Sequence, residues 1–281
     1  MDSGPNGNGQ ARAALTGDDL TRYLARIGLD GFEDLPASLS TLMALQVSHV
    51  RAVTYENLDI HLGREIRLDL PSLVSKIVDQ RRGGYCYEQN TLFAAALEGL
   101  GYPVRRYLGR VRLGNATSPR PATHMVLLVN NQVVDVGFGA ATPLGPLPLG
   151  GTATYGSWTW TTERALSPEG EEVWQVRLFD TVLYTFDDQP RHPVDYQTPN
   201  YWSSTHPDSI FAQRPIAQRW EGDVQLALIG PELTERHADG TLTTALVGPA
   251  DIGPLLHARF DLQLSPTDTA RLASLVATTG R

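Results

Sequence analysis

The chain has 281 residues, of which 41% are hydrophobic and 19% are charged. This composition excludes a disordered or fibrous protein and leaves room for one to three packed units, while a net charge of −8 argues against a general affinity for nucleic acid or anionic membranes. One cysteine cannot form an internal disulfide or a thiolate-rich metal site, so we expect a cytoplasmic protein without a metal.

The first part of the chain is predicted to be helical. Residues 1–15 are expected to form a flexible tail, because the first ten are rich in Gly and Asn and do not match a secretory signal. From residue 16 to 102, apolar side chains recur at helical spacing, which predicts a helical domain. Its expected helices are 19–27, 40–53, 71–79 and a fourth from the Gly83-Gly84 pair to Gly99.

From residue 103 the apolar period changes to two, which predicts a β-rich domain over 103–205, a twisted antiparallel sheet or barrel. Residues 141–151 are expected to be a loop between strands, and residues 206–281 a smaller α/β unit. The expected strands are 104–113, 125–129, 132–136, 173–179, 181–186, 224–229 and 241–246, followed by a helix over 267–277. No apolar run approaches the length of a membrane span.

The lone cysteine lies in the segment Arg82-Gly83-Gly84-Tyr85-Cys86-Tyr87-Glu88-Gln89-Asn90. The glycine pair allows a sharp turn with close backbone approach, and the apolar spacing after it places Cys86 in the first turn of a helix. There the helix dipole and free backbone N–H groups favour the thiolate. A buried structural cysteine is the alternative, but the glycine pair and the polar residues at 88 and 90 favour a nucleophile.

A catalytic thiolate needs a histidine, and His124 stands out because it opens the strand 125–129. Asn130-Asn131 is typical of a two-residue hairpin turn, which pairs 129 with 132, 128 with 133, 127 with 134 and 126 with 135. Asp135 then becomes the diagonal neighbour of His124 on the same face. We expect Asp135 to accept the Nδ1 proton of His124 and to leave Nε2 for Cys86; the alternative is an Asp135 that faces solvent.

Four motifs in this order resemble the arylamine N-acetyltransferases, and the resemblance covers about residues 16–280. They are Tyr55-Glu56-Asn57-Leu58, Arg82-Gly83-Gly84-x-Cys86-x-Glu88-x-Asn90, Thr123-His124 and Val134-Asp135-Val136-Gly137-Phe138-Gly139. The resemblance implies an α+β fold in which the helical domain (16–102) and an antiparallel β-barrel domain (103–205) form a cysteine-proteinase-like core of the papain and transglutaminase type. The remaining residues, 206–281, become an α/β lid.

The resemblance also implies the chemistry. Cys86, His124 and Asp135 form the triad, acetyl-CoA is the acyl donor, and aromatic amines, hydrazines and hydroxylamines are acetylated by a ping-pong route through an acetyl-cysteine. It implies no metal, no nucleic acid and no membrane; a homodimer remains open. The absence of a long insertion between barrel and lid favours a bacterial-type enzyme, although Tyr55 stands where Phe is usual and the turn between His124 and Asp135 is short.

Further residues resemble the family's structural shell around the nucleophile. Among them we expect Arg82 to pair with one of two glutamates and Asn90 to orient a backbone or catalytic group. The shell consists of Arg82, Glu56, Asn57, Glu88 and Asn90.

Ligand contacts are expected from the neighbours of the triad. Tyr85 and Phe138 are candidates for an aromatic wall against the amine, with ordinary core aromatics as the alternative, and Thr123 for the acyl-donor cleft. The candidates for the CoA phosphates are Arg105, Arg106, Arg110, Arg112 and Arg120, with a solvated strand face as the alternative.

Two other classes of protein compete with an acetyltransferase. One is a different thiol-acyl enzyme on the same scaffold: a transglutaminase-like protein, an amidase or a cysteine protease. A papain-type protease would have another signature around its cysteine and normally a secreted, disulfide-bearing context. The other is a binding protein without the chemistry, which the presence of all three triad residues disfavours.

Overall fold

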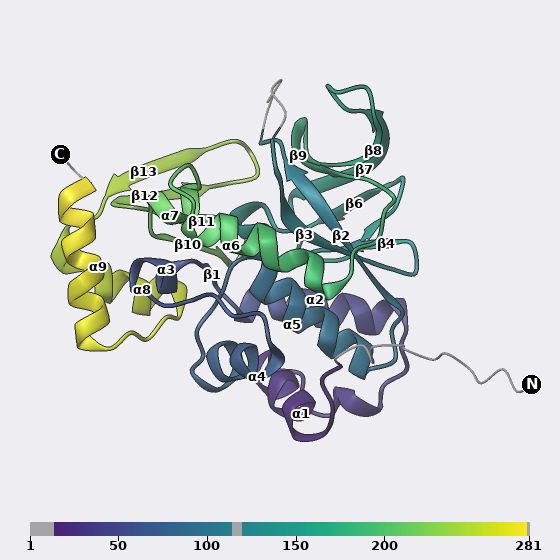
Figure 1. The fold of residues 1–281 in the computed structure, drawn as a ribbon, viewed down its shortest axis with the longest axis horizontal. Helices are drawn as coiled ribbons and strands as arrows, with labels where there is room; N and C mark the ends of the chain where they lie inside the picture. The colour runs from purple at the N-terminus through teal and green to yellow at the C-terminus, as the bar shows by residue number, and fades with distance from the viewer. Residues whose placement is uncertain (1–13, 114–119, 280–281) are drawn as a thin grey trace, which may run out of the picture.

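The computed structural model describes residues 14–113 and 120–279, which form an α+β fold (Figure 1). Most of the predicted tail therefore lies outside the described residues. Leu15, assigned to that tail, is buried and its N–H bonds to the carbonyl of Ala95 at 2.9 Å, so it belongs to the core and the prediction was wrong for this residue. Within the described segments, no helix is long and apolar enough to cross a membrane.

The first part of the chain is helical, as predicted, because its apolar stripes are buried against one another. In the first helix the predicted stripe residues Leu20, Tyr23 and Leu24 are all buried. The predicted helix 71–79 is divided, since a short α-helix continues as a π-helical turn over Val74–Asp79. The helices are α1 (Gly17–Arg26), α2 (Leu39–Ala52), α3 (Leu58–His61), α4 (Leu70–Leu73) and α5 (Cys86–Gly99).

Eight antiparallel strands follow in the order β5-β4-β3-β2-β9-β8-β7-β6 and form a nearly closed barrel, at the upper right of Figure 1. The edge strand that contains Pro148 approaches the far end of the sheet, where the Thr162 hydroxyl donates to the Pro148 carbonyl at 2.6 Å. Strand β5 lies within the predicted loop 141–151, because two residues are too few to show a period. The strands are β2 (Val104–Val111), β3 (Ala122–Val129), β4 (Gln132–Val134), β5 (Leu147–Pro148), β6 (Thr152–Tyr155), β7 (Trp158–Leu166), β8 (Glu172–Leu178) and β9 (Thr181–Phe186).

The hairpin between β3 and β4 has the predicted turn. Asn130 and Asn131 have φ of 47° and 61°, and residues 127, 128 and 129 pair with 134, 133 and 132. The predicted next pair, 126 with 135, is absent from this ladder, which ends at Val134. Instead, the Asp135 carbonyl accepts from the Gln46 side chain at 3.1 Å and the Val136 N–H donates to Asn90 Oδ1 at 3.1 Å. Helices α2 and α5 thus replace the strand partner.

The last part of the chain forms a second sheet, of order β1-β10-β11-β12-β13, packed against two helices at the left of Figure 1. Two of its strands, β10 and β12, were not predicted, and β1 (Tyr55–Glu56) comes from the helical segment, so this sheet crosses the expected domain boundary. The other elements are α6 (Gln197–Thr205), α7 (Ile210–Gln213), β10 (Ile216–Glu221), β11 (Val224–Ile229), β12 (Glu232–Arg236), β13 (Leu242–Leu246), α8 (Ile252–Phe260) and α9 (Pro266–Thr279).

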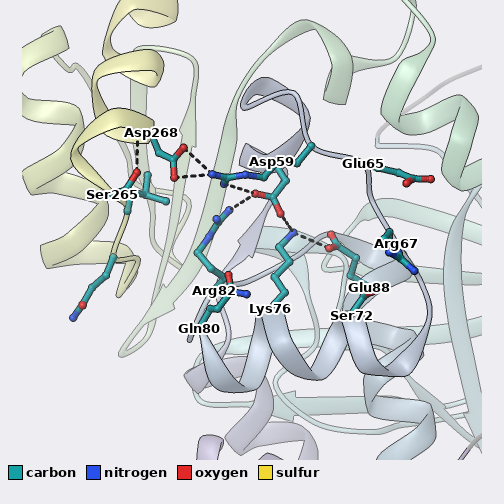
Figure 2. A pocket seen from close by; sticks show the side chains of 13 residues that line it. Asp59, Glu65, Arg67, Ser72, Lys76, Gln80, Arg82, Glu88, Ser265 and Asp268 are labelled. Carbon is teal, nitrogen blue, oxygen red and sulfur yellow. Dashed lines mark hydrogen bonds and ion pairs between the residues drawn. The ribbon is translucent and has the colours of Figure 1, made fainter.

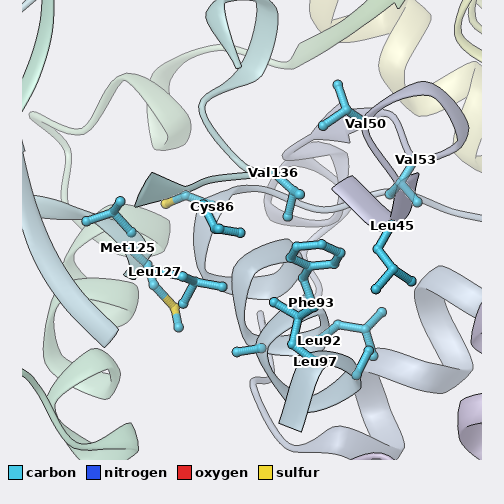
Figure 3. Packing of buried hydrophobic residues seen from close by; sticks show 14 of the residues in the cluster. Leu45, Val50, Val53, Cys86, Leu92, Phe93, Leu97, Met125, Leu127 and Val136 are labelled. Atoms are coloured by element: carbon cyan, nitrogen blue, oxygen red, sulfur yellow. The ribbon is translucent and has the colours of Figure 1, made fainter. Parts of the chain in front are cut away.

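Helix α5 lies in the largest hydrophobic cluster of the described chain. Its residues Leu92, Phe93 and Leu97 are fully buried and share this cluster with Met125 and Leu127 of the barrel (Figure 3). Burying a side chain of this size contributes about 1.5–3 kcal/mol. The helix that begins at the cysteine is therefore held on both sides, by the helical segment and by the barrel.

Candidate active site

Cys86 is the first residue of α5 and is 3% exposed. The glycines before it are required by close approach, as predicted. A Cβ on Gly83 would lie 1.9 Å from the Thr54 carbonyl oxygen, and one on Gly84 would lie 2.8 Å from Glu88 Cβ. Any larger residue would push the start of α5 away from its neighbours.

The hairpin brings His124 and Asp135 to this helix start. His124 and Asp135 are 2% and 0% exposed, and the distance from His124 Nε2 to Asp135 Oδ2 is 2.7 Å. A Cβ on Gly137 would lie 2.7 Å from Cys86 Cα, so the segment after Asp135 lies directly against the nucleophile. The three candidate triad residues are thus placed together.

The contact between the imidazole and the carboxylate uses the nitrogen opposite to the one predicted. Asp135 contacts Nε2, so Nδ1 is the nitrogen left for Cys86. The register predicts which side chains meet, but the rotation of the ring depends on packing. The ring lies between Phe138 and Tyr184, with centroid distances of 5.0 and 4.7 Å. The expectation that Nε2 faces Cys86 was wrong for this reason.

Electrostatics favour an ionised His124–Asp135 pair. Burial by itself lowers the pKa of His124, but the charge and hydrogen bond of Asp135, with a hydrogen bond from Cys86, raise it to about 10. For Asp135, burial raises the pKa, whereas His124 and hydrogen bonds from Asn90 and the Gly137 N–H lower it below its usual value. The imidazole beside Cys86 is therefore positively charged at neutral pH.

Asn90 has the orienting contacts expected of it. Its Nδ2 donates to Asp135 Oδ1 at 3.0 Å and to the carbonyl of Met125 at 2.8 Å. The Gly137 N–H donates to the same carboxylate oxygen at 2.9 Å. With His124 on the other oxygen, both oxygens of the buried carboxylate are hydrogen-bonded.

The other predicted shell residues lie behind the nucleophile rather than at the reacting side. Arg82 pairs with Glu56 at 2.7 Å, as expected, and Glu88 pairs with Lys76 at 2.7 Å. Asn57 Oδ1 accepts from the N–H of Ile216 at 2.7 Å, which ties the helical segment to β10. These residues support the site through its backbone.

A cavity of about 310 Å³ opens beside the cysteine. Of the predicted ligand contacts, Thr123 and Phe138 line it, but Tyr85 does not. The Tyr85 ring is fully buried and its hydroxyl hydrogen-bonds to Asn200, so the expectation of an amine wall at this residue was wrong. Tyr55 is an aromatic lining residue that sequence reasoning missed, although its motif was recognised. The lining residues include Tyr55, Cys86, Val111, Leu113, Thr123, His124, Phe138, Phe211, Gln218, Gln225, Thr234 and Arg236.

None of the five arginines predicted for CoA is among the described residues that line this cavity. Arg106 pairs with Glu98 at 2.7 Å, and the buried Arg112 pairs with Glu169 at 2.8 Å. Arg110 donates to the carbonyl of Arg120 at 2.7 Å.

The permanent positive charge in the cavity wall is instead Arg236, whose guanidinium lies 5.7 Å from the centroid of the Trp158 ring. Within the described segments, no carboxylate forms an ion pair with Arg236. It lies on β12, far in sequence from every recognised motif, so no local signal pointed to it. The described residues also hold no group of three His, Cys, Asp or Glu side chains suited to a metal ion.

Comparison with known proteins places this site in a family. A model of the N-acetyltransferase family matches residues 38–269. The arylamine N-acetyltransferase of Mycolicibacterium smegmatis is 36% identical over 258 residues, which cover 88% of this chain and 92% of that protein. The chain belongs to the arylamine N-acetyltransferase family. Membership confirms the family predicted from the motifs and shows that the chain is an enzyme, so a protease or a binding protein without chemistry was the wrong alternative.

Solved structures of arylamine N-acetyltransferases have the same fold. The enzyme from Mycobacterium abscessus superimposes with a TM-score of 0.85 at 34% identity, covering 92% of this chain and 94% of that one. The Mycobacterium marinum enzyme in complex with CoA has a TM-score of 0.80 at 31% identity and covers 91% and 99%. The predicted α+β class is therefore confirmed.

Proposed function

We propose that this arylamine N-acetyltransferase transfers the acetyl group of acetyl-CoA to aromatic amines, hydrazines and hydroxylamines by a ping-pong mechanism, through an acetyl-cysteine on Cys86. The observation that carries the proposal is the buried His124–Asp135 contact of 2.7 Å beside a helix-start cysteine that lines a cavity. The names of the relatives and the CoA complex of the Mycobacterium marinum enzyme support acetyl-CoA as the donor.

In the first half-reaction the Cys86 thiolate attacks the thioester carbonyl. A bond forms between Sγ and the acetyl carbon, and the tetrahedral oxyanion faces the backbone N–H groups at the start of α5. When the carbon–sulfur bond to CoA breaks, the leaving thiolate takes a proton from the His124 imidazolium. Because the imidazolium is buried against Asp135, this proton is held at the site until it is needed.

In the second half-reaction the amine attacks the acetyl-cysteine. The neutral His124 takes a proton from the attacking nitrogen, the bond from Sγ to the acetyl carbon breaks, and the thiolate–imidazolium pair is restored. Phe138 packs edge-on against His124, so an aromatic amine stacked in the cavity would lie against the same wall. The largely apolar lining suits an aromatic ring.

The phosphates of CoA need a cation, and Arg236 is the residue we propose for them. It lines the cavity from β12 and has the unpaired guanidinium described above. Thr123, whose carbonyl lies 3.7 Å from Cys86 Sγ, lines the path of the acyl group. The five arginines predicted for this role are excluded from the proposal by their positions.

Intact-mass spectrometry after mixing with acetyl-CoA and no amine tests the proposal. The wild-type protein should gain one acetyl group, located on Cys86 by peptide mapping, and should lose it when an aromatic amine is added. Cys86→Ala should gain none. Labelling of Cys86→Ala to the wild-type level would contradict the assignment of the nucleophile, and a wild-type protein that stays unlabelled while it acetylates an amine would contradict the ping-pong route.

A further inference from the structure

Lys76 is the chain's single lysine among 23 lysine and arginine residues, and it lies half-buried behind the nucleophile. It belongs to the π-helical turn Val74–Asp79, and its side chain is 12% exposed. Its ammonium lies 2.7 Å from Glu88 Oε1 and 2.9 Å from Asp59 Oδ2, between α5 and α3 (Figure 2). A charge with so little of its side chain exposed needs such partners.

Glu88 links this lysine to the backbone at the cysteine. Its Oε2 accepts a hydrogen bond of 3.0 Å from the N–H of Tyr85, the residue before Cys86. Its side chain is 2% exposed, and a Cβ on Gly84 would lie 2.9 Å from the same Oε2. One carboxylate oxygen is thus fixed by Lys76 and the other by the N–H of Tyr85, which immediately precedes α5.

We propose that Lys76 is a positioning residue for the acyl transfer. It fixes the Glu88 carboxylate that holds the peptide next to Cys86, and it cancels a negative charge that would otherwise oppose the thiolate two residues away. This inference rests on the proposed function, because it concerns the reactivity of the same thiol. Lys76 touches neither the cavity nor the triad, so it acts only through Glu88.

The surrounding charges explain why a lysine stands here. Arg82 already contacts Asp59 Oδ1 at 3.2 Å and Glu56 at 2.7 Å, which leaves a compact gap between Asp59 and Glu88. An ammonium is a compact point charge, whereas the planar guanidinium of arginine favours two oxygens in one plane. Burial lowers the pKa of the Lys76 amine, but the carboxylates of Glu88, Glu56 and Asp59 outweigh burial and raise it above its ordinary value. Lys76 therefore stays charged at neutral pH.

The rate of Cys86 alkylation by iodoacetamide, measured against pH, tests the inference. Burial raises the pKa of Glu88, and Lys76→Gln removes the cation that opposes this shift; the fraction of Glu88 that stays ionised at the pH of the assay then lies beside the thiolate without its ammonium partner, so the half-maximal pH should rise. In Glu88→Gln one negative charge near Cys86 is lost while Lys76 keeps its ion pair with Asp59, so the half-maximal pH should fall. Lys76→Gln/Glu88→Gln keeps a side-chain acceptor for the Tyr85 N–H and should return close to the wild-type value. Other titratable groups near Cys86 are unchanged in these variants: His124, Asp135, Tyr55, Tyr85 and Tyr87.

Arg67→Gln is the matched control: Arg67 and Lys76 both line the polar pocket drawn in Figure 2, but Arg67 pairs with the exposed Asp69. It should leave the alkylation profile unchanged. Shifts of the same sign in both single variants, or no shift in either, would overturn the proposal and leave Lys76 with a structural role only. If Lys76→Gln does not fold, the direction of the Glu88→Gln shift decides. Alkylation needs no acyl donor, so it remains informative even if the wild-type enzyme is not acetylated by acetyl-CoA.

Discussion

The first turn of α5 separates two buried polar clusters that differ in how completely their groups are paired. On the cavity side, Cys86 Sγ lies 3.7 Å from the carbonyl oxygen of Thr123 and next to the 2.7 Å pair of His124 and Asp135. On the opposite side, Lys76 and Arg82 are each bonded to two acidic residues. On the cavity side, the cysteine sulfur thus remains available to react. On the supporting side, carboxylates compensate the charges of both cations.

The cavity side therefore carries the reactive groups, and the supporting side holds the helix start in place. Removing one partner from a buried charged pair costs about 3–5 kcal/mol, so substitutions on the supporting side should affect stability as well as rate. Cavity-side substitutions that keep volume and hydrogen bonds should affect rate with little loss of stability. The following predictions test that division, from the largest expected effect to the smallest.

Asp135→Asn should cause the largest loss of activity. The amide keeps an acceptor for Asn90 and the Gly137 N–H, so the fold should be retained. It removes the charge that keeps His124 protonated and disturbs the tautomer, which lowers the rate by roughly 10⁴-fold in comparable triads. Stopped-flow measurement of acetyl-enzyme formation, with circular dichroism for the fold, checks this. A rate within tenfold of wild type would contradict the role of Asp135.

Insertion of one residue between Asn130 and Asn131 should also abolish most activity. A one-residue slip of β4 turns Asp135 to the other face of the sheet unless a bulge absorbs the insertion. We expect the rate of acetyl transfer to fall at least about a hundredfold with the fold retained, because His124 loses both the negative charge of Asp135 and its hydrogen bond to that carboxylate. The matched control is a two-residue insertion, which can preserve the register as a longer loop. Equal activity of the two folded variants would show that the hairpin register does not position Asp135.

Arg236→Gln should weaken binding of the acyl donor rather than the chemistry. Loss of one charge-assisted hydrogen bond costs about 1.5–3 kcal/mol, so the KM for acetyl-CoA should rise roughly tenfold or more. The rate with p-nitrophenyl acetate, a donor without phosphates, should be unchanged. Arg110→Gln is the control, since Arg110 bonds to a carbonyl outside the cavity. Phosphate binding by Arg236 would be contradicted if Arg236→Gln slowed the reaction equally with both donors, or if it left the reaction with both donors unchanged.

His49→Gln should have the smallest effect on activity and should change the response of stability to acid. The buried His49 imidazole contacts the Tyr23 hydroxyl at 2.8 Å and Gln89 Oε1 at 3.2 Å. Burial lowers its pKa to about 3, so between pH 6.5 and 3 the unfolded chain binds the proton and the folded chain does not. This group therefore weakens folding as pH falls through that window, by up to about 1.4 kcal/mol per pH unit.

Urea unfolding of wild type and His49→Gln at several pH values checks this. The variant should lose less stability than wild type between pH 6.5 and 4, and both should alkylate at the same rate at pH 7. Parallel stability profiles would show that His49 does not titrate between the two states. A large change in the alkylation rate of His49→Gln would show that His49 also affects the reactivity of Cys86.

Local signals in the sequence were sufficient for the start of α5 and for the hairpin. The glycine pair and the apolar spacing after it predict a helix from Gly83-Gly84 with Cys86 in its first turn, and the helix observed begins at Cys86. Asn130-Asn131 predicts a turn with positive φ and hence the pairing of 127–129 with 132–134. Both conclusions depend on residues close in sequence, whose backbone preferences and side-chain period act directly on their neighbours. The fold of the whole chain was predicted from the resemblance of its four motifs to a known family.

Tertiary contacts decided what lies between those segments. The nitrogen of His124 that meets Asp135 depends on packing against Phe138 and Tyr184, and Arg236 reaches the cavity because β12 joins a sheet whose edge strand is Tyr55–Glu56. Lys76 meets Asp59 and Glu88 across two other elements. Ring rotation, two-residue strands and paired buried charges leave no periodic signal, because each depends on partners distant in the chain and on the desolvation that only the folded core imposes.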